Sequence, residues 1–232
     1  MRHHRFYQPN ISFENSKIII SDARLMQQWR RVLRYSIGDE LVLFGDGQEH
    51  VCEITHLDKR AVSLRQLATS PSVVPQKRLT LAWSLLKRTN NELILQKATE
   101  LGISELQPIE ADRSEKHNVT NTQAERWQRI VIEASEQCDR GDVPIIHEPI
   151  GSSGFISKQH SHLIVAEKSA DDMPQRQSDD VSRDTVLIGP EGGWSDDELA
   201  LFRQHHVPVI ELGDFTLRAE TAAIISASYL LK

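Results

Sequence analysis

The chain contains little cysteine and no long apolar run. Its 232 residues include two cysteines, Cys52 and Cys138, and these form no metal-binding or redox spacing. No run of about 18 apolar residues is present to span a membrane. The first residues lack the apolar core of a signal peptide. We therefore expect a cytoplasmic protein without membrane association, structural disulfides or a bound metal.

Motifs for nucleotide phosphates are missing as well. Neither GxxxxGK followed by Ser or Thr nor GxGxxG occurs, although residues 189–193 (GPEGG) are rich in glycine. The apolar residues 186–188 before this segment predict a buried strand. Ser195 after it, with Glu198 three positions on, predicts a capped helix with an acidic first turn. This layout favours a neutral or cationic ligand over a phosphate, and a plain strand-to-helix turn is the alternative.

A second segment of the same kind follows. Residues 207–212 predict another buried strand that ends at Gly213, and a helix is expected from about Ala219. Arg218 and Glu220 bracket the turn between the two elements. Two such loops at one edge of an α/β sheet can form a single pocket. Within it, Arg218 and Glu220 are either an ion pair or a catalytic couple.

The net charge of −6 at pH 7 argues against a nucleic-acid partner until its distribution is considered. Residues 1–34 contain seven Lys and Arg against two acids, a balance of +5, so that residues 35–232 carry −11. Such asymmetry indicates a basic arm that binds RNA on an otherwise acidic body. The alternative is that Arg30, Arg31 and Arg34 form a solvated helix face.

The first part of the chain is predicted to be rich in β-strands. Short apolar runs separated by turns such as residues 45–47 (GDG) predict a small barrel. A short helix is expected from Asp22 to about Leu33. Residues 68–75, which contain two prolines, predict a linker between domains at residues 1–70 and 76–232.

From residue 77 onward, strands alternate with helices, which predicts a mainly parallel α/β sheet. A helix is expected to end at Gly102, and residues 103–109 predict a strand that Pro108 breaks late. Thr122 and Glu125 have the spacing of a capping box that opens the next helix. Residues 167–184 predict a polar loop.

The glycine-rich loops are also the strongest part of a family resemblance. Three segments resemble the ribosomal RNA small-subunit methyltransferase E family of the SPOUT class: residues 187–193 (LIGPEGG), 212–213 (LG) and 217–222 (LRAETA). The resemblance continues in the same order through residues 31–34, 95–102, 112–114 and 133–140. One departure is visible, because the family usually has Pro and a basic residue soon after the Gly at position 213. This chain has Asp214, Phe215 and Thr216 there, so the pocket wall is expected to differ.

The resemblance implies an α/β protein with an N-terminal PUA-like RNA-binding β-barrel and a C-terminal SPOUT domain that contains a trefoil knot. It also implies a homodimer that uses S-adenosylmethionine to methylate N3 of a uridine in 16S ribosomal RNA of the small subunit. The implied cofactor residues are Ala166, Glu167, Leu187, Ile188, Gly189, Pro190, Glu191, Gly192, Gly193, Leu212, Gly213, Leu217, Thr221 and Ala222. The expected RNA-binding residues are Arg2, Arg5, Arg30, Arg31, Arg34 and Arg113.

The chemistry of such a reaction suggests roles for two residues. Uridine N3 carries a proton at neutral pH, so the proton must leave or the developing anion must be stabilised. Arg218 is expected to stabilise the charge on a carbonyl oxygen, and Glu220 to orient Arg218 or to act as the base. Arg113, Lys87 and Arg88 either contact phosphate or the target nucleotide, or are solvated surface charges.

Two other functions are compatible with the sequence. Within the same fold, the acceptor could be a ribose 2′-hydroxyl group. From a different class, the protein could be a non-catalytic ribosome-assembly factor that binds RNA through its basic N-terminal part. Asp214 and Phe215 would then mark a pocket that has lost its cofactor.

Overall fold

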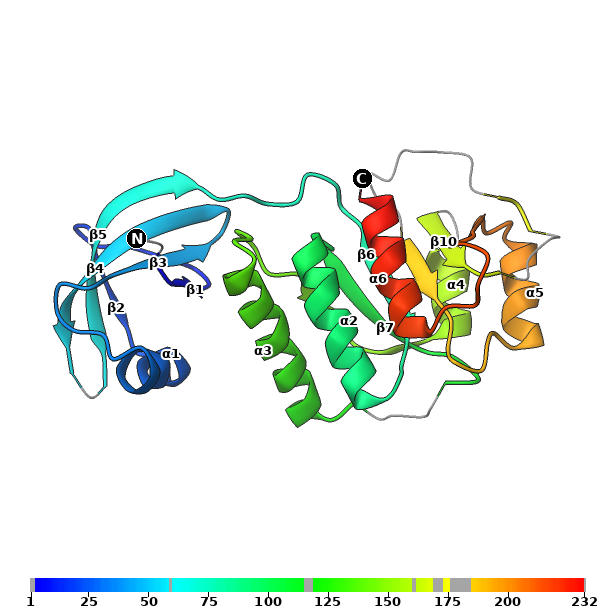
Figure 1. The fold of residues 1–232 in the computed structure, drawn as a ribbon, viewed down its shortest axis with the longest axis horizontal. Helices are drawn as coiled ribbons and strands as arrows, with labels where there is room; N and C mark the ends of the chain where they lie inside the picture. The colour runs from blue at the N-terminus through cyan, green and yellow to red at the C-terminus, as the bar shows by residue number, and fades with distance from the viewer. Residues whose placement is uncertain are drawn as a thin grey trace. The chain divides into compact units, whose positions relative to one another are not determined.

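The computed structural model describes residues 3–58, 60–114, 119–159, 162–168, 173–175 and 185–231, which form two compact units (Figure 1). Unit 1 comprises Met1–Val74 and Ser135–Val143, and unit 2 comprises Pro75–Ala134 and Pro144–Lys232. Most of the polar loop expected at residues 167–184 lies outside the described residues.

Unit 1 is built on a five-stranded sheet with the order β1-β3-β4-β5-β2. Strands β1 and β3 pair in parallel, and the remaining neighbours are antiparallel. The hairpin turn expected at residues 45–47 joins β3 to β4. The strands are β1 (Arg5–Tyr7), β2 (Lys17–Ile20), β3 (Glu40–Gly45), β4 (Gln48–Leu57) and β5 (Val62–Pro71).

A short helical segment supplies the centre of the core of unit 1. The Asp22 carboxylate accepts a hydrogen bond from the Leu25 backbone N–H and caps α1 (Ala23–Gln27), which continues into a π-helical turn, η1 (Gln28–Val32). Trp29 in this turn is fully buried and packs 5.2 Å from the ring of Phe6. All five strands contribute residues to the same core. The predicted helix from Asp22 is therefore confirmed.

Strand β5 and the cysteines of unit 1 bear on two sequence expectations. The linker expected at residues 68–75 is wrong in its first half, because β5 continues to Pro71 and pairs with the start of β4. Both cysteines are free. Burial raises the pKa of the Cys52 thiol to about 12, so that this residue behaves as an apolar core side chain.

Unit 2 contains a seven-stranded sheet in which every recorded pairing is parallel. The order is β12-β10-β11-β6-β7-β8, and β9 also pairs with β7. The parallel sheet expected from the alternation of strands and helices is confirmed. The strands are β6 (Thr80–Ser84), β7 (Glu105–Glu110), β8 (Ile145–Ile146), β9 (Ile150–Gly151), β10 (Leu163–Ala166), β11 (Thr185–Ile188) and β12 (Val209–Ile210).

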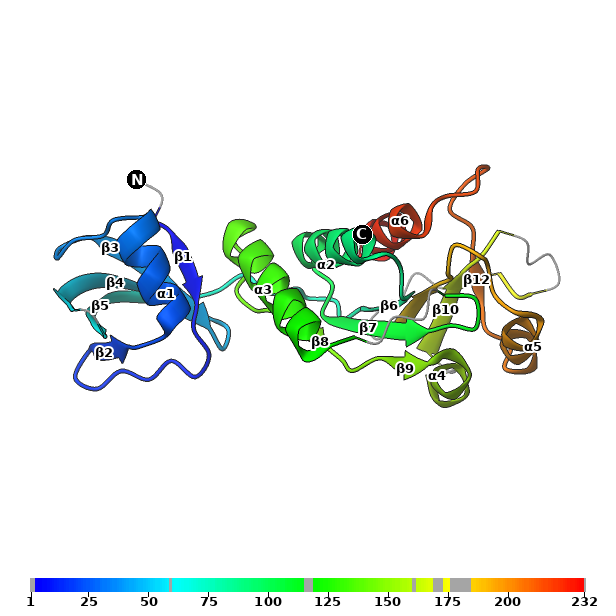
Figure 2. The same cartoon turned by 90° about the horizontal axis from the view of Figure 1, so that it is seen from below.

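Helices cover both faces of this sheet, and α2 and α6 lie on the face opposite α4 and α5 (Figure 2). The alternation of side chains along β6 explains the two layers. Ala82 packs in the core that includes residues of α4 and α5, whereas Trp83 contacts Asn91 of α2 and Trp127 of α3. The helices are α2 (Arg88–Leu101), α3 (Asn121–Gln137), α4 (Ser152–Gln159), α5 (Asp196–Gln204) and α6 (Ala219–Leu230).

Helix boundaries follow the capping chemistry, with one correction. The capping box at Ser195 and Glu198 is present, and α2 ends at Gly102 as expected. The capping box expected at Thr122 is wrong, because the helix begins at Asn121 and the Thr120 hydroxyl accepts from the Gln123 N–H at 3.3 Å. Pro108 does not break its strand and pairs in register with Trp83. Within the described residues, no helix has both the length and the apolarity to span a membrane.

Asn91 joins α2 to the sheet and provides a test of the fold. Its side chain is fully buried, accepts from the Trp83 indole N–H and the Leu86 N–H, and donates to the Leu86 carbonyl. Asn91→Ala should lower the free energy of unfolding by about 3 kcal/mol, because each buried polar group left without a partner costs about 1–3 kcal/mol. Chemical denaturation measures this difference. Asn90→Ala, at the partly exposed neighbouring position, should cost under about 1 kcal/mol; equal losses in the two variants would contradict the assignment.

Candidate active site

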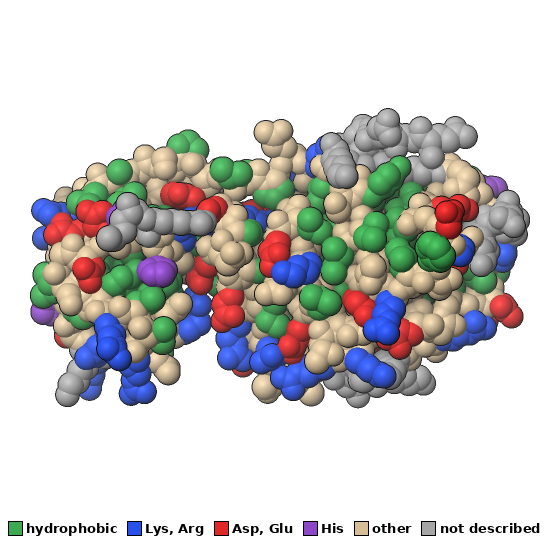
Figure 3. Space-filling model, viewed as in Figure 1, with side chains coloured by type: hydrophobic (Ala, Val, Ile, Leu, Met, Phe, Trp, Pro, Cys, Tyr) green, Lys and Arg blue, Asp and Glu red, His purple; other side chains and the backbone are tan. Residues whose placement is uncertain are grey.

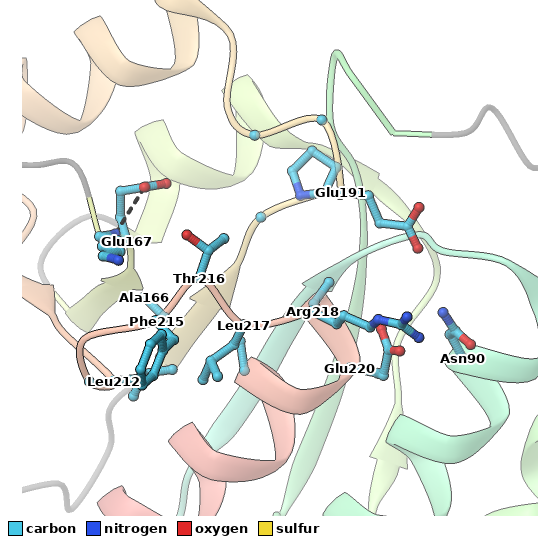
Figure 4. Close-up of a pocket in the computed structure, with 18 of the residues that line it drawn as sticks. Asn90, Ala166, Glu167, Glu191, Leu212, Phe215, Thr216, Leu217, Arg218 and Glu220 are labelled. Carbon is cyan, nitrogen blue, oxygen red and sulfur yellow. Dashed lines mark hydrogen bonds between the residues drawn. The ribbon is translucent and has the colours of Figure 1, made fainter.

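A pocket of about 910 Å³ lies at the carboxyl edge of the unit 2 sheet (Figure 4). Parallel strands end at the same edge, so the segments that follow β6, β10, β11 and β12 meet there. The Ser84 hydroxyl at the end of β6 donates to the Ile188 carbonyl at the end of β11, 3.0 Å away. The lining residues are Lys87, Asn90, Ala166, Glu167, Lys168, Gly189, Pro190, Glu191, Gly192, Gly193, Ile210, Leu212, Gly213, Phe215, Thr216, Leu217, Arg218, Ala219, Glu220 and Ala222.

The glycine-rich loop lines the pocket, and a side chain would be crowded at two of its positions. A Cβ at Gly189 would lie 2.9 Å from the indole nitrogen of Trp194, and one at Gly192 would lie 3.3 Å from the Cβ of Arg113. The Gly193 N–H donates to the Pro190 carbonyl and closes the turn. The loop therefore presents main-chain N–H and C=O groups to a ligand.

One end of the pocket holds most of its apolar side chains, together with Glu167 and Thr216. Figure 4 shows Ala166, Leu212, Phe215 and Leu217 together on this side. Phe215 is 82% exposed, so it is available to a ligand. The Lys168 ammonium donates to the Asp214 carbonyl at 2.5 Å and connects the segment after β10 to the segment after β12.

The other end of the pocket is polar. Arg218, Glu220 and Asn90 extend into it from the start of α6 and the first turn of α2 (Figure 4). Glu220 is only 9% exposed, and its Oε2 atom has no hydrogen-bond partner among the described residues. Among the ion pairs between described residues, none joins Arg218 to Glu220, so the ion-pair alternative has no support. A buried carboxylate oxygen without a partner indicates a place for a ligand hydrogen-bond donor.

Most of the residues expected at the cofactor site lie in this pocket, but three do not. Leu187 and Ile188 are buried inside β11, and Thr221 lies outside the lining. Lys87 and Asn90 line the pocket, although only Lys87 is a candidate from the sequence. The sequence does not predict that Lys87 and Asn90 line this pocket, because their position depends on the pairing of β6 with β11. Across the described part of the chain, no three His, Cys, Asp or Glu side chains are grouped as metal ligands.

The expected RNA-binding arginines fall into different environments. Arg30, Arg31 and Arg34 are exposed in unit 1, and Figure 3 shows Lys and Arg side chains gathered at one end of this unit. Arg30 and Arg31 line a second pocket of about 670 Å³ that also includes Arg60. Arg113 is half exposed in unit 2 and approaches Asp196 to 4.0 Å. Arg2 lies outside the described residues.

Arg5 differs from the other arginines because its side chain is 7% exposed. The guanidinium forms an ion pair with Glu49, donates to the Arg140 carbonyl at 3.2 Å and lies 4.5 Å from the centre of the Phe44 ring. These contacts stabilise unit 1 and leave little surface for a phosphate. We therefore leave Arg5 out of the RNA-binding set.

Gly189→Ala tests the close packing of the loop. The added methyl group would collide with Trp194, and overpacking in a well-packed core costs about 1–3 kcal/mol of unfolding free energy. Gly154 in α4 has no atom within 4 Å of an added Cβ, so Gly154→Ala should be neutral or stabilising. Thermal unfolding distinguishes the two variants. A Gly189→Ala protein as stable as the Gly154→Ala protein would contradict the packing argument.

Comparison with known proteins identifies the family. The RNA methyltransferase domain family matches residues 74–231, and the RNA methyltransferase PUA domain family matches residues 30–67. The chain is 32% identical over 230 residues to ribosomal RNA small subunit methyltransferase E of Rickettsia conorii, covering 97% of this chain and 93% of the relative. It is 30% identical over 203 residues to the protein of the same name from Aquifex aeolicus, and the match covers 87% of this chain and 89% of that relative.

Solved structures share the fold. A methyltransferase from Legionella pneumophila, solved with bound SAM, is 30% identical with a TM-score of 0.83, covering 99% of this chain and 97% of that chain. Ribosomal RNA small subunit methyltransferase E of Neisseria gonorrhoeae, solved with bound S-adenosyl methionine, is 25% identical with a TM-score of 0.87, covering 99% and 97%. With an N-terminal PUA-like domain and a C-terminal methyltransferase domain, the chain belongs to the ribosomal RNA small subunit methyltransferase E family.

Proposed function

We propose that this protein transfers a methyl group from S-adenosylmethionine to N3 of a uridine in 16S ribosomal RNA of the small subunit. The names of its relatives and the cofactor bound in two structural neighbours support the reaction class and the methyl donor. The two ends of the pocket differ in polarity, as expected for a site that holds a nucleoside-containing donor beside an acceptor base.

The apolar end fits the cofactor. Ala166, Leu212 and Leu217 offer an apolar wall for an adenine ring. Main-chain groups of the loop around Gly189 and Gly192 can recognise the ribose and the adenine edge, because no side chain obstructs the approach. Backbone amides also offer no nucleophile that would compete for the methyl group. When bound, S-adenosylmethionine supplies that methyl group as part of a sulfonium.

The unpartnered carboxylate oxygen of Glu220 is the observation that carries the assignment of the acceptor. The Watson–Crick edge of uracil presents a carbonyl oxygen, the N3–H and a second carbonyl oxygen, which is an acceptor, donor, acceptor pattern. Glu220 offers the matching acceptor, and Arg218 and Asn90 at the same end of the pocket offer donors. Cytosine has no hydrogen at N3, and a ribose 2′-hydroxyl does not present a donor between two separate carbonyl acceptors.

The same residues account for the chemistry. Glu220 accepts the N3 proton, which frees the nitrogen lone pair for attack on the methyl group. Arg218 stabilises the negative charge that develops on the adjacent carbonyl oxygen. Asn90 orients the ring through the other carbonyl oxygen, so that N3 faces the donor. The water-poor position of Glu220 strengthens each of these interactions.

The function is tested by identifying the methylated nucleoside. Purified protein is incubated with labelled S-adenosylmethionine and unmethylated small subunits, and the RNA is then digested and separated. The proposal predicts label on N3-methyluridine. Label on a ribose would show that the acceptor is a 2′-hydroxyl group and not N3. The assembly-factor alternative would be favoured if no label appears on subunits that another member of the family can methylate.

Arg218→Ala should reduce turnover about 10²-fold or more, because it removes the group that stabilises the developing charge. Its affinity for S-adenosylmethionine should remain close to that of the unmodified protein. Steady-state rates and calorimetric titration measure the two quantities. Arg129→Ala, which removes an exposed arginine outside the pocket lining, is the matched control. Near-normal turnover in Arg218→Ala would remove this residue from the mechanism.

The RNA-binding role of unit 1 gives a separate prediction. Arg30 and Arg31 line the arginine-rich pocket with Arg60, so Arg30→Ala and Arg31→Ala should each weaken binding to small subunits. Salt dependence gives a second readout. In each variant, the slope of the logarithm of the RNA association constant against the logarithm of salt concentration should fall by about 1 for every phosphate group that the protein no longer neutralises. Arg65→Ala, which removes an exposed arginine already paired with Glu53, is the control. Unchanged salt dependence in both test variants would contradict the proposal.

The finer features implied by the family resemblance also remain proposals. These are a trefoil knot in the C-terminal domain, a homodimer whose two chains jointly form the RNA site, and a cytoplasmic location. The meeting of the segments after β10, β11 and β12 at one pocket is compatible with such a knot. Exposed apolar residues on α6, Ile225 and Tyr229, are compatible with a dimer surface.

A further inference from the structure

A buried carboxylate outside the pocket lining connects the glycine-rich loop to a distant segment. Glu198 in the first turn of α5 is fully buried. Its Oε2 atom accepts from the Ser195 N–H at 2.8 Å, and its Oε1 atom accepts from the Asp112 N–H at 3.1 Å. The Ser195 hydroxyl accepts from the Glu198 N–H and donates to Asp112 Oδ2 at 2.5 Å. These contacts form a closed ring of three residues.

This ring does more than cap a helix. A capping box needs only the reciprocal bonds between Ser195 and Glu198. Here the second carboxylate oxygen and the serine hydroxyl both reach Asp112, which is more than 80 residues away in the sequence. Three of these four bonds have a carboxylate oxygen as the acceptor, so the ring resists local opening.

The ring fixes the glycine-rich loop from two sides. Ser195 lies two residues after Gly193 and sets the point at which the loop enters α5. Asp112 precedes Arg113, whose Cβ and carbonyl oxygen lie 3.3 Å and 3.4 Å from the position of a Cβ on Gly192. Movement of the loop away from the pocket or toward Arg113 would therefore break the ring or collide with Arg113.

We propose that Glu198 is a positioning residue, which holds residues 189–193 in the shape that binds the cofactor and so sets the affinity for S-adenosylmethionine. This inference rests on the proposed function for the identity of the ligand. A loop that is already ordered loses less conformational entropy on binding, so the ring contributes to affinity without touching the ligand. Turnover depends instead on Arg218, which immediately precedes α6, and on Glu220 in the first turn of that helix.

Glu198→Gln is the direct test in the full chain. The side-chain amide keeps one acceptor oxygen but places its NH₂ group against a backbone N–H, which breaks one bond of the ring. The Kd and the KM for S-adenosylmethionine should each rise about 10-fold, which corresponds to loss of about one ordering interaction. The kcat at saturating cofactor should change less than about 3-fold, because the groups at the polar end are unaffected. Asp197→Asn removes the same charge from an exposed neighbour and should leave all three quantities unchanged.

Hydrogen exchange tests the same ring independently of cofactor binding. In Glu198→Gln, the amides of residues 189–195 and of Asp112 should exchange faster, while those of β6 and α6 should be unchanged. If this variant does not fold, Asp112→Ala, which removes the acceptor of the Ser195 hydroxyl at the exposed end of the ring, should give the same pattern. Normal exchange in the loop together with a normal Kd would overturn the inference. A third outcome separates the two proposals. If the unmodified protein binds no S-adenosylmethionine but loop exchange is faster in Glu198→Gln, the proposed function is contradicted. The role of the ring in holding the loop is then still supported.

Discussion

The parallel arrangement of the unit 2 sheet is the constraint on which the site depends. Strands β6, β10, β11 and β12 are separated in the sequence, yet their pairing brings all four carboxyl ends to one edge. Every part of the pocket lies at the end of one of these strands or in the segment that follows it. The buried bond from Ser84 to the Ile188 carbonyl fixes the ends of β6 and β11 relative to one another. A change of register between these strands would separate the glycine-rich loop from Asn90 and Lys87.

Backbone groups and side chains have different roles in the pocket. At one end, glycines allow the main chain to approach a ligand, and the Glu198 ring limits how far that loop can move. At the other end, one oxygen of the buried Glu220 carboxylate has no hydrogen-bond partner in the described part of the chain and lies near potential donors. A buried charge in that state is costly unless a ligand completes its hydrogen bonds. A bound base that donates to this oxygen would complete its hydrogen bonds, which favours a ligand with a donor at that position.

Local features of this architecture could be predicted from the sequence. The capping box at Ser195, the strand before Gly189 and the start of α6 at Ala219 follow from capping chemistry and apolar patterns over a few residues. Long-range features could not be predicted in this way. The pairing of β6 with β11 brings Asn90 into the same pocket as Glu220, and the folding of unit 1 decides that Arg5 is buried rather than exposed. The error at Thr122 is local, since Thr120 offers a competing hydroxyl two residues earlier.

The most direct test of this account is a crystal structure of the protein with S-adenosylmethionine. The account predicts the adenosine against Ala166, Leu212 and Leu217, the main chain of residues 189–193 beside it, and the sulfonium methyl group directed toward Arg218 and Glu220. A cofactor whose methyl group points away from these two residues, or one bound outside this pocket, would contradict the assignment of donor and acceptor ends.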